Sequence, residues 1–178
     1  MSLALVDEAR LGQQGTLTRI RAKHGTRPRA PRDQRCEWAY ISGAVCPERC
    51  TTAAIVMPCA NAGAMSLHLA ETGRNVAQGA HAAVIFDGAG YHIAAKLLVP
   101  ANITLIKLPP HSPELNPVEN IRACLRANKL ANTVHENHAG TLDKACQAWM
   151  FLDAGKDRIA SLTKRDWQRS MIRAAGIS

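Results

Sequence analysis

Aromatic residues are scarce in this sequence, which contains two Phe, two Tyr and three Trp and is 4% aromatic overall. A surface that stacks unpaired bases needs several aromatic side chains, so this scarcity argues against a platform for single-stranded nucleic acid. No apolar run approaches the roughly 20 residues of a membrane-spanning helix. The N-terminus has no basic region and already carries Asp7 and Glu8, which argues against a secretory signal peptide. We therefore expect a cytoplasmic protein without a membrane partner.

The six cysteines lack the spacing of a structural zinc site. Cys46 and Cys50 lie close together in the sequence, but no second close pair of Cys or His residues accompanies them. Reduced thiols are the default state in the cytoplasm. The length of 178 residues, with 47% hydrophobic and 20% charged residues, fits one domain with its own core. We expect residues 1–178 to form a single domain, with residues 155–178 as a basic helical tail.

Acidic residues are rare in two basic zones of the chain. Between Arg10 and Arg35 there are eight Lys or Arg residues and a single acid, Asp33, and a second basic cluster runs from Lys156 to Arg173. The formal net charge is +8 and the sequence pI is about 9.5. Such zones are suited to binding the phosphates of a polyanion. A solubilising surface explains the same charge equally well, so charge alone does not decide between the two.

Short apolar runs and turn residues predict an α/β protein. We expect strands over residues 3–6, 37–45, 51–57, 82–86 and 103–108. We expect helices over residues 61–77, 93–98, 116–129, 141–151 and 163–174. The polar segment 10–34, with several Gly and Pro residues, predicts a β-ribbon or loop. On the helix over 116–129 the predicted buried stripe includes Asn128, and on the helix over 141–151 it includes Cys146.

Three carboxylates are placed where predicted elements begin or end. Asp7 follows the first short strand, Asp87 follows the apolar run at 82–86, and Glu119 is the third residue of a helix that begins at Asn116-Pro117. Mg²⁺ prefers hard oxygen ligands, mainly a few carboxylates together with phosphate oxygens and water. Two such ions about 4 Å apart stabilise the attacking and leaving oxygens of phosphodiester transfer. The three residues are therefore candidate metal ligands.

Each of these carboxylates also has a structural interpretation. Alternation along the first strand puts Leu3, Leu5 and Asp7 on one face and Glu8 on the other, so one of the two acids enters a site at most. Asp87 precedes a glycine and fits a turn. Glu119 resembles the acid of a helix-capping box. The residues alone leave both interpretations open.

Two segments resemble the signature of a known family. They are Asp87-Gly-Ala-Gly-Tyr-His92 and the proline-rich run from Leu108 to Asn120, which contains Asn-Pro-Val-Glu. They are similar to the DDE-superfamily transposases of bacterial insertion sequences, relatives of the mariner group. Asp7-Glu-Ala-Arg10, the Gly-Thr-Arg-Pro turn at 25–28, and the segments at 40–45 and 61–65 resemble the same family. The resemblance extends from about Leu3 to Trp167.

The resemblance implies a ribonuclease-H-like fold, with a mixed sheet flanked by helices. It implies that Asp7, Asp87 and Glu119 are catalytic and bind Mg²⁺, for which Mn²⁺ can substitute. The implied reaction is metal-dependent cleavage at the ends of the mobile element, followed by attack of the freed 3′-hydroxyl on target DNA. His92 corresponds to a histidine near the second carboxylate, although a packed or capping histidine explains it equally well. Asn116 would orient Glu119 by capping its helix.

The implied partner is double-stranded DNA, both as element ends and as target, with the protein acting as a homodimer at the nucleoid. Phosphate contacts are expected from basic residues of both charged zones. The candidates are Arg10, Arg19, Lys23, Arg27, Arg29, Arg32 and Arg165.

The chain also departs from the family pattern. Members normally carry a helix-turn-helix region before the first Asp, so we expect end recognition to come from a separate helix-turn-helix protein or a frameshift partner. Arg21 and Arg122 stand where relatives have Trp, and we expect the lost aromatic at Arg122 to leave a poorly filled core site. The 31 residues between Asp87 and Glu119 are slightly few for the group. A truncated, inactive DNA-binding remnant is therefore an alternative, and a host nuclease of ribonuclease-H type is another.

Overall fold

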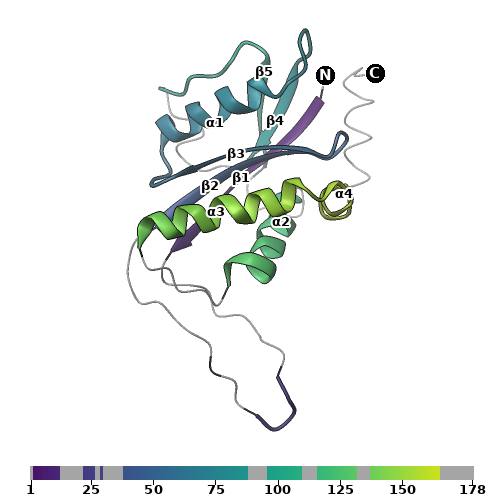
Figure 1. Ribbon diagram of the computed structural model, residues 1–178. Helices are drawn as coiled ribbons and strands as arrows, with labels where there is room; N and C mark the ends of the chain where they lie inside the picture. Colours follow the sequence, from purple (N-terminus) through teal and green to yellow (C-terminus); the bar gives the residue numbers. More distant parts are fainter. Residues whose placement is uncertain are drawn as a thin grey trace.

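The computed structural model describes residues 2–12, 22–26, 29, 38–87, 96–109, 116–131 and 137–164. Within these residues the chain forms a five-stranded sheet with the strand order β3-β2-β1-β4-β5 (Figure 1). The strands are β1 (Ser2–Gly12), β2 (Trp38–Cys46), β3 (Thr51–Met57), β4 (Ala82–Phe86) and β5 (Ile103–Lys107). No helix in this part of the chain is long and apolar enough to cross a membrane.

The sheet is mixed, and β1 lies at its centre. β1 pairs antiparallel with β2, which pairs antiparallel with β3 through a tight turn that holds Cys50 at a φ of 51°. On its other side β1 pairs parallel with β4, which in turn pairs parallel with β5. This arrangement confirms the predicted mixed sheet, because the antiparallel hairpin and the parallel crossovers share one central strand.

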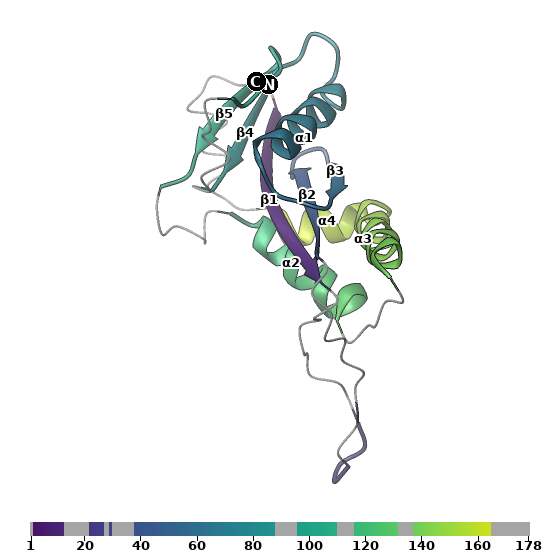
Figure 2. The same ribbon diagram turned by 90° about the vertical axis from the view of Figure 1, so that its left-hand side faces the viewer.

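Helices cover both faces of this sheet. Helix α1 (Ala62–Arg74) lies on one face, and α2 (Val118–Leu125), α3 (His138–Asp153) and α4 (Lys156–Thr163) lie on the other, as Figure 2 also shows. A π-helical turn, η3 (Arg126–Leu130), continues α2. Asn61 begins α1 by accepting a hydrogen bond from the backbone N–H of Ala64 at 2.9 Å, as its position in the sequence predicts.

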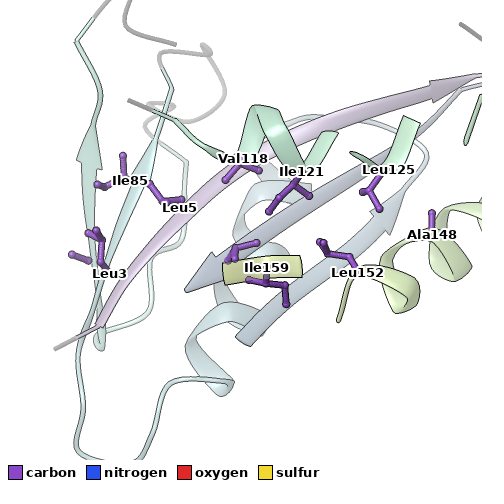
Figure 3. Packing of buried hydrophobic residues seen from close by; sticks show 11 residues of the cluster. Leu3, Leu5, Ile85, Val118, Ile121, Leu125, Ala148, Leu152 and Ile159 are labelled. Atoms are coloured by element: carbon purple, nitrogen blue, oxygen red, sulfur yellow. The ribbon is translucent and has the colours of Figure 1, made fainter. Parts of the chain in front are cut away.

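Alternating side chains of β1 supply the core on both faces. Leu3 and Leu5 pack with residues of β4, α2, α3 and α4, whereas Ala4 and Val6 pack with α1. Figure 3 shows the first of these clusters. Its buried members are Leu3, Leu5, Val45, Ala83, Ile85, Val118, Ile121, Leu125, Ala148, Leu152 and Ile159. The predicted split between the two faces of the first strand is confirmed.

Several predicted boundaries are wrong. The first strand does not end near Asp7, because its residues from Leu5 to Gly12 remain paired with β2. Helix α1 ends at Arg74 rather than near Ala77, since Asn75 caps it with backbone and side-chain bonds to Glu71. Residues 96–98 are not helical, and 93–95 lie outside the described residues.

The structure has a helix that was not predicted, and two buried stripes differ from the prediction. Helix α4 lies at 156–163, whereas residues 165–174 of the predicted helix over 163–174 lie outside the described residues. Helix α4 packs into the core through Ile159. Asn128 and Cys146 are exposed, because each lies just beside the buried stripe of its helix.

Gly43 of β2 leaves space for the side chain of Trp149. It is the strand partner of Asp7, and a Cβ atom built on it would lie 2.1 Å from the Trp149 ring. The indole Nε1 of Trp149 donates a hydrogen bond to the hydroxyl of Thr52 at 3.2 Å. Helix α3 therefore approaches the sheet closely beside Asp7 because position 43 has no side chain.

We predict that Gly43→Ala lowers the free energy of unfolding by about 1–3 kcal/mol, because the indole must move out of its contact with the sheet. The same substitution in a Trp149→Leu background should cost less, since the smaller side chain leaves room. Urea unfolding of the native chain, both single variants and the double variant measures this coupling. An equal cost of Gly43→Ala in both backgrounds would contradict the packing interpretation.

Candidate active site

Asp7 and Asp87 belong to neighbouring parallel strands. The pairing of β1 with β4 aligns Ser2 with Ala82 and continues to Leu5 with Ile85. Asp7 lies within β1, whereas Asp87 is the first residue after β4 and is exposed. The charge of Asp87 raises the pKa of Arg122, which contacts Asp7.

Glu119 reaches the same place from α2. Its neighbours Val118 and Ile121 are buried in the core cluster that contains Leu5 and Ile85, which fixes the first turn of the helix on this face. The side chain of Glu119 is 52% exposed and points to the rim of the site. Asp7 and Glu119 therefore lie close enough for their charges to interact, with Asp7 as the buried member at 7% exposure.

Asn116 connects the start of α2 to β1. Its buried side chain accepts a hydrogen bond from the backbone N–H of Val118 and donates one to the carbonyl oxygen of Val6, both at 3.3 Å. The first bond holds the turn before α2, whose N-cap position is Pro117 rather than the predicted Asn116. The second bond reaches the residue next to Asp7, so Asn116 sets the position of one acid relative to the other.

Arg122 lies among the carboxylates and was not predicted to belong to the site. Its Nη1 donates to Asp7 Oδ2 at 3.1 Å and to Glu119 Oε1 at 2.8 Å. The Arg122 side chain is 24% exposed and forms ion pairs with both acids, and the expectation of a poorly filled core site at this position stays a prediction. The spacing of three residues from Glu119 is a signal for that ion pair. No sequence signal links Arg122 to Asp7.

Burial dominates the electrostatics of Asp7. Burial, and more weakly the charge of Glu119, raise the pKa of Asp7 to about 6, although Arg122 and the backbone N–H of Glu8 lower it. Burial lowers the pKa of Arg122, but the charges of Asp7, Glu119 and Asp87 outweigh that effect and raise it above its usual range. The Arg122 guanidinium therefore interacts electrostatically with all three carboxylates.

The donor chemistry fits a divalent cation, although the carboxylates are spread around the guanidinium. Among the described residues, no three His, Cys, Asp or Glu side chains lie close enough together to hold one metal ion. Asp7 and Glu119 nevertheless both contact a single cationic nitrogen through oxygen atoms. Carboxylate oxygens around one cation position are the ligands that Mg²⁺ and Mn²⁺ prefer.

Three of the predicted DNA-contacting residues lie within the described part of the chain, and all three are exposed. Lys23 and Arg29 are exposed, and Lys23 belongs to a turn in which Gly25 has a φ of 79°. Arg10 is exposed on β1, with its guanidinium 4.1 Å from the ring centre of Trp38. The other predicted site residues lie outside the described residues; these are Arg19, Arg27, Arg32, His92 and Arg165.

Solved structures with the same fold belong to a transposase. The Mos1 transposase paired-end complex with the left transposon end matches with a TM-score of 0.61 and 13% identity over 90% of this chain and 55% of that chain. The Mos1 strand transfer complex matches with a TM-score of 0.60 and 14% identity over 90% of this chain and 52% of that one. The chain thus spans about half the length of the Mos1 chains. The fold of this chain is therefore ribonuclease-H-like.

The family follows from the sequence match. The model of the DDE superfamily endonucleases matches residues 2–139, and the chain therefore belongs to this superfamily, as the resemblance predicts. An uncharacterised protein of Sinorhizobium fredii, y4pE/y4sA, is 48% identical over 130 residues, which cover 73% of this chain and 96% of that protein.

The buried carboxyl of Asp7 predicts pH-dependent stability in metal-free buffer. Its pKa is about 6 in the folded chain and 3.8 for an ordinary Asp, so the folded state binds the proton more tightly than the unfolded state. The resulting penalty on folding is full above about pH 6 and disappears as the pH falls to about 4. Its size is about 3 kcal/mol. Relative to Asp7→Asn, the native chain should gain about this much stability as the pH falls.

Urea unfolding followed by tryptophan fluorescence, in EDTA from about pH 4 to about pH 8, measures this difference. Asp143→Asn removes an exposed carboxylate of α3 and controls for the loss of one negative charge. A difference between the native chain and Asp7→Asn that stays constant across this range would contradict the prediction.

Loss of the Asn116 side chain should destabilise the fold. Asn116→Ala leaves the N–H of Val118 and the carbonyl of Val6 without their partners, which we expect to cost about 1–2 kcal/mol. Asn128→Ala is the matched control, since its exposed amide bonds only within its own helix, to Cys124; we expect a cost of about 0.5 kcal/mol or less. Thermal and urea unfolding compare the two variants, and equal costs would argue against a special role for Asn116.

Proposed function

We propose that this chain is the catalytic domain of a transposase that cleaves DNA at the ends of an insertion sequence and transfers the strands to target DNA. The observation that carries the proposal is that Asp7 and Glu119 contact one nitrogen of Arg122, whose pKa the charge of Asp87 also raises, on a ribonuclease-H-like sheet. Membership of the DDE superfamily and the fold shared with Mos1 support it.

In this proposal Asp7, Asp87 and Glu119 hold Mg²⁺, for which Mn²⁺ substitutes. Two of the Mos1 structures with this fold are paired-end complexes with Mn and with Mg, which supports the choice of ions. Bound divalent cations supply charge that stabilises the attacking and leaving oxygens of phosphodiester transfer. Asn116 positions Glu119 through its bonds to α2 and β1. His92, which lies outside the described residues, is proposed as a second positioning residue.

The proposed substrate is double-stranded DNA, as element ends and as target. A net charge of +8 favours a polyanionic partner. Lys23 and Arg29 are exposed and suited to phosphate contacts. Arg10, Arg19, Arg27, Arg32 and Arg165 are proposed for the same role. The active form is proposed to be a homodimer at the nucleoid, with the element ends recognised by a helix-turn-helix protein or frameshift partner.

The alternative is an inactive DNA-binding remnant of such a transposase. It shares the basic residues and differs in lacking metal-dependent cleavage. The observation in its favour is Arg122, which contacts two of the carboxylates. Cleavage and DNA binding must therefore be measured separately.

We predict that the native chain nicks supercoiled plasmid DNA in Mn²⁺ or Mg²⁺ and that Asp87→Asn lowers the rate at least about 100-fold, since a lost metal ligand removes several kcal/mol of transition-state stabilisation. Affinity for duplex DNA, measured by gel shift in EDTA, should change less than about twofold, because phosphate contacts come from other residues.

Asp143→Asn on the exposed side of α3 is the control and should keep the native nicking rate. Native protein that binds DNA but does not nick it would favour the remnant. Preferential cleavage of an RNA–DNA hybrid would favour the host nuclease.

A further inference from the structure

Arg122 has an unusual place for a helix arginine. It lies three residues after Glu119 on α2, and one nitrogen, Nη1, contacts both Glu119 and the buried Asp7. A pair with an exposed acid alone would be an ordinary surface ion pair of little consequence. The contact with Asp7 differs, because the Asp7 side chain is only 6% exposed and has little water to solvate its charge.

The guanidinium is held at one nitrogen. Its Nε is buried and has no hydrogen-bond partner among the described residues. Arginine binds carboxylates most strongly when two nitrogens form parallel bonds, and here neither carboxylate is bound in that way. The Arg122 side chain is partly exposed, so a path outward from the site is open. The contact is therefore suited to displacement.

We propose that Arg122 is an internal counter-ion that occupies the cation position between Asp7 and Glu119, so that a divalent metal binds only when this side chain swings away. The inference rests on the proposed function, because it concerns the same metal site. Asp7 Oδ2 and Glu119 Oε1, which Arg122 contacts, are oxygens that a metal needs. The positive charge of the guanidinium also repels a divalent cation at this short range.

The contacts of Arg122 with Asp7 and Glu119 also affect the stability of the metal-free protein. Without a cation, Asp7 and Glu119 repel one another, and Arg122, which the charge of Asp87 also attracts, relieves this repulsion. Arg122 therefore stabilises the metal-free fold and weakens metal binding through the same contacts. These two effects have opposite signs, and a purely structural salt bridge would produce only the first.

The test is binding of Mn²⁺ alone to the full chain, measured as free Mn²⁺ by electron paramagnetic resonance. Arg122→Gln keeps a polar side chain but removes the charge, and it should bind Mn²⁺ at least about tenfold more tightly than the native chain, or about 1.4 kcal/mol. Arg122→Lys keeps the charge and should bind close to the native affinity. Arg126→Gln removes the same charge one turn further along and should change affinity less than about twofold, because the added distance and water screen it.

Thermal unfolding provides a second readout that does not require strong binding. Metal-free Arg122→Gln should melt at a lower temperature than the native chain, and saturating Mn²⁺ should raise its melting temperature by more than it raises that of the native chain. This response also shows that the variant is folded. If Arg122→Gln does not fold, Arg122→Met replaces it as the variant without the charge. Its Mn²⁺ affinity is then compared with that of Arg122→Lys, which keeps the charge.

The outcomes separate the inference from the proposed function. Tighter Mn²⁺ binding in Arg122→Gln, lost again on adding Asp87→Asn, supports both. Native binding that Asp87→Asn abolishes, with no gain in Arg122→Gln, overturns the role of Arg122 and keeps the metal site. No Mn²⁺ binding to folded native protein or to folded Arg122→Gln overturns both.

Discussion

The acidic site depends on the register between β1 and β4. Because side chains alternate along a strand, a slip of one residue would move Asp7 to the face covered by α1 and separate it from Glu119. The core enforces this register, since Leu5 and Ile85 must face α2 together. The same apolar contacts that stabilise the sheet therefore position Asp7 and the helix that carries Glu119.

Burial of Asp7 makes the site electrostatically demanding. A charged carboxylate removed from water needs a cation nearby, and the metal-free chain supplies one in Arg122. Family members with tryptophan at this position would lack that charge. The site of this chain thus contains its own cation, Arg122. The family pattern, with tryptophan at this position, does not provide one.

Much of the fold is predictable from sequence, because it depends on local signals. Capping by Asn61 marks the start of α1, and the apolar run at 82–86 marks β4. The convergence of the three carboxylates stays a prediction, because it depends on contacts between distant segments. The extension of β1 to Gly12 was missed, since pairing with β2 overrides the polar character of that segment. Arg122 was missed because its contact with Asp7 spans 115 residues, and no local pattern reports so distant a partner.

The long separation of these contacts has a consequence for the newly made chain. The bond from Asn116 to Val6 joins residues 110 positions apart, so neither β1 nor the early hairpin contains a complete acidic site. Contacts of such high sequence separation form only after a large loss of chain entropy. A nascent chain that has emerged only as far as β5 lacks Glu119. If the chain cleaves DNA as proposed, this activity is therefore absent during synthesis until the segment that forms α2 has left the ribosome and docked on the sheet.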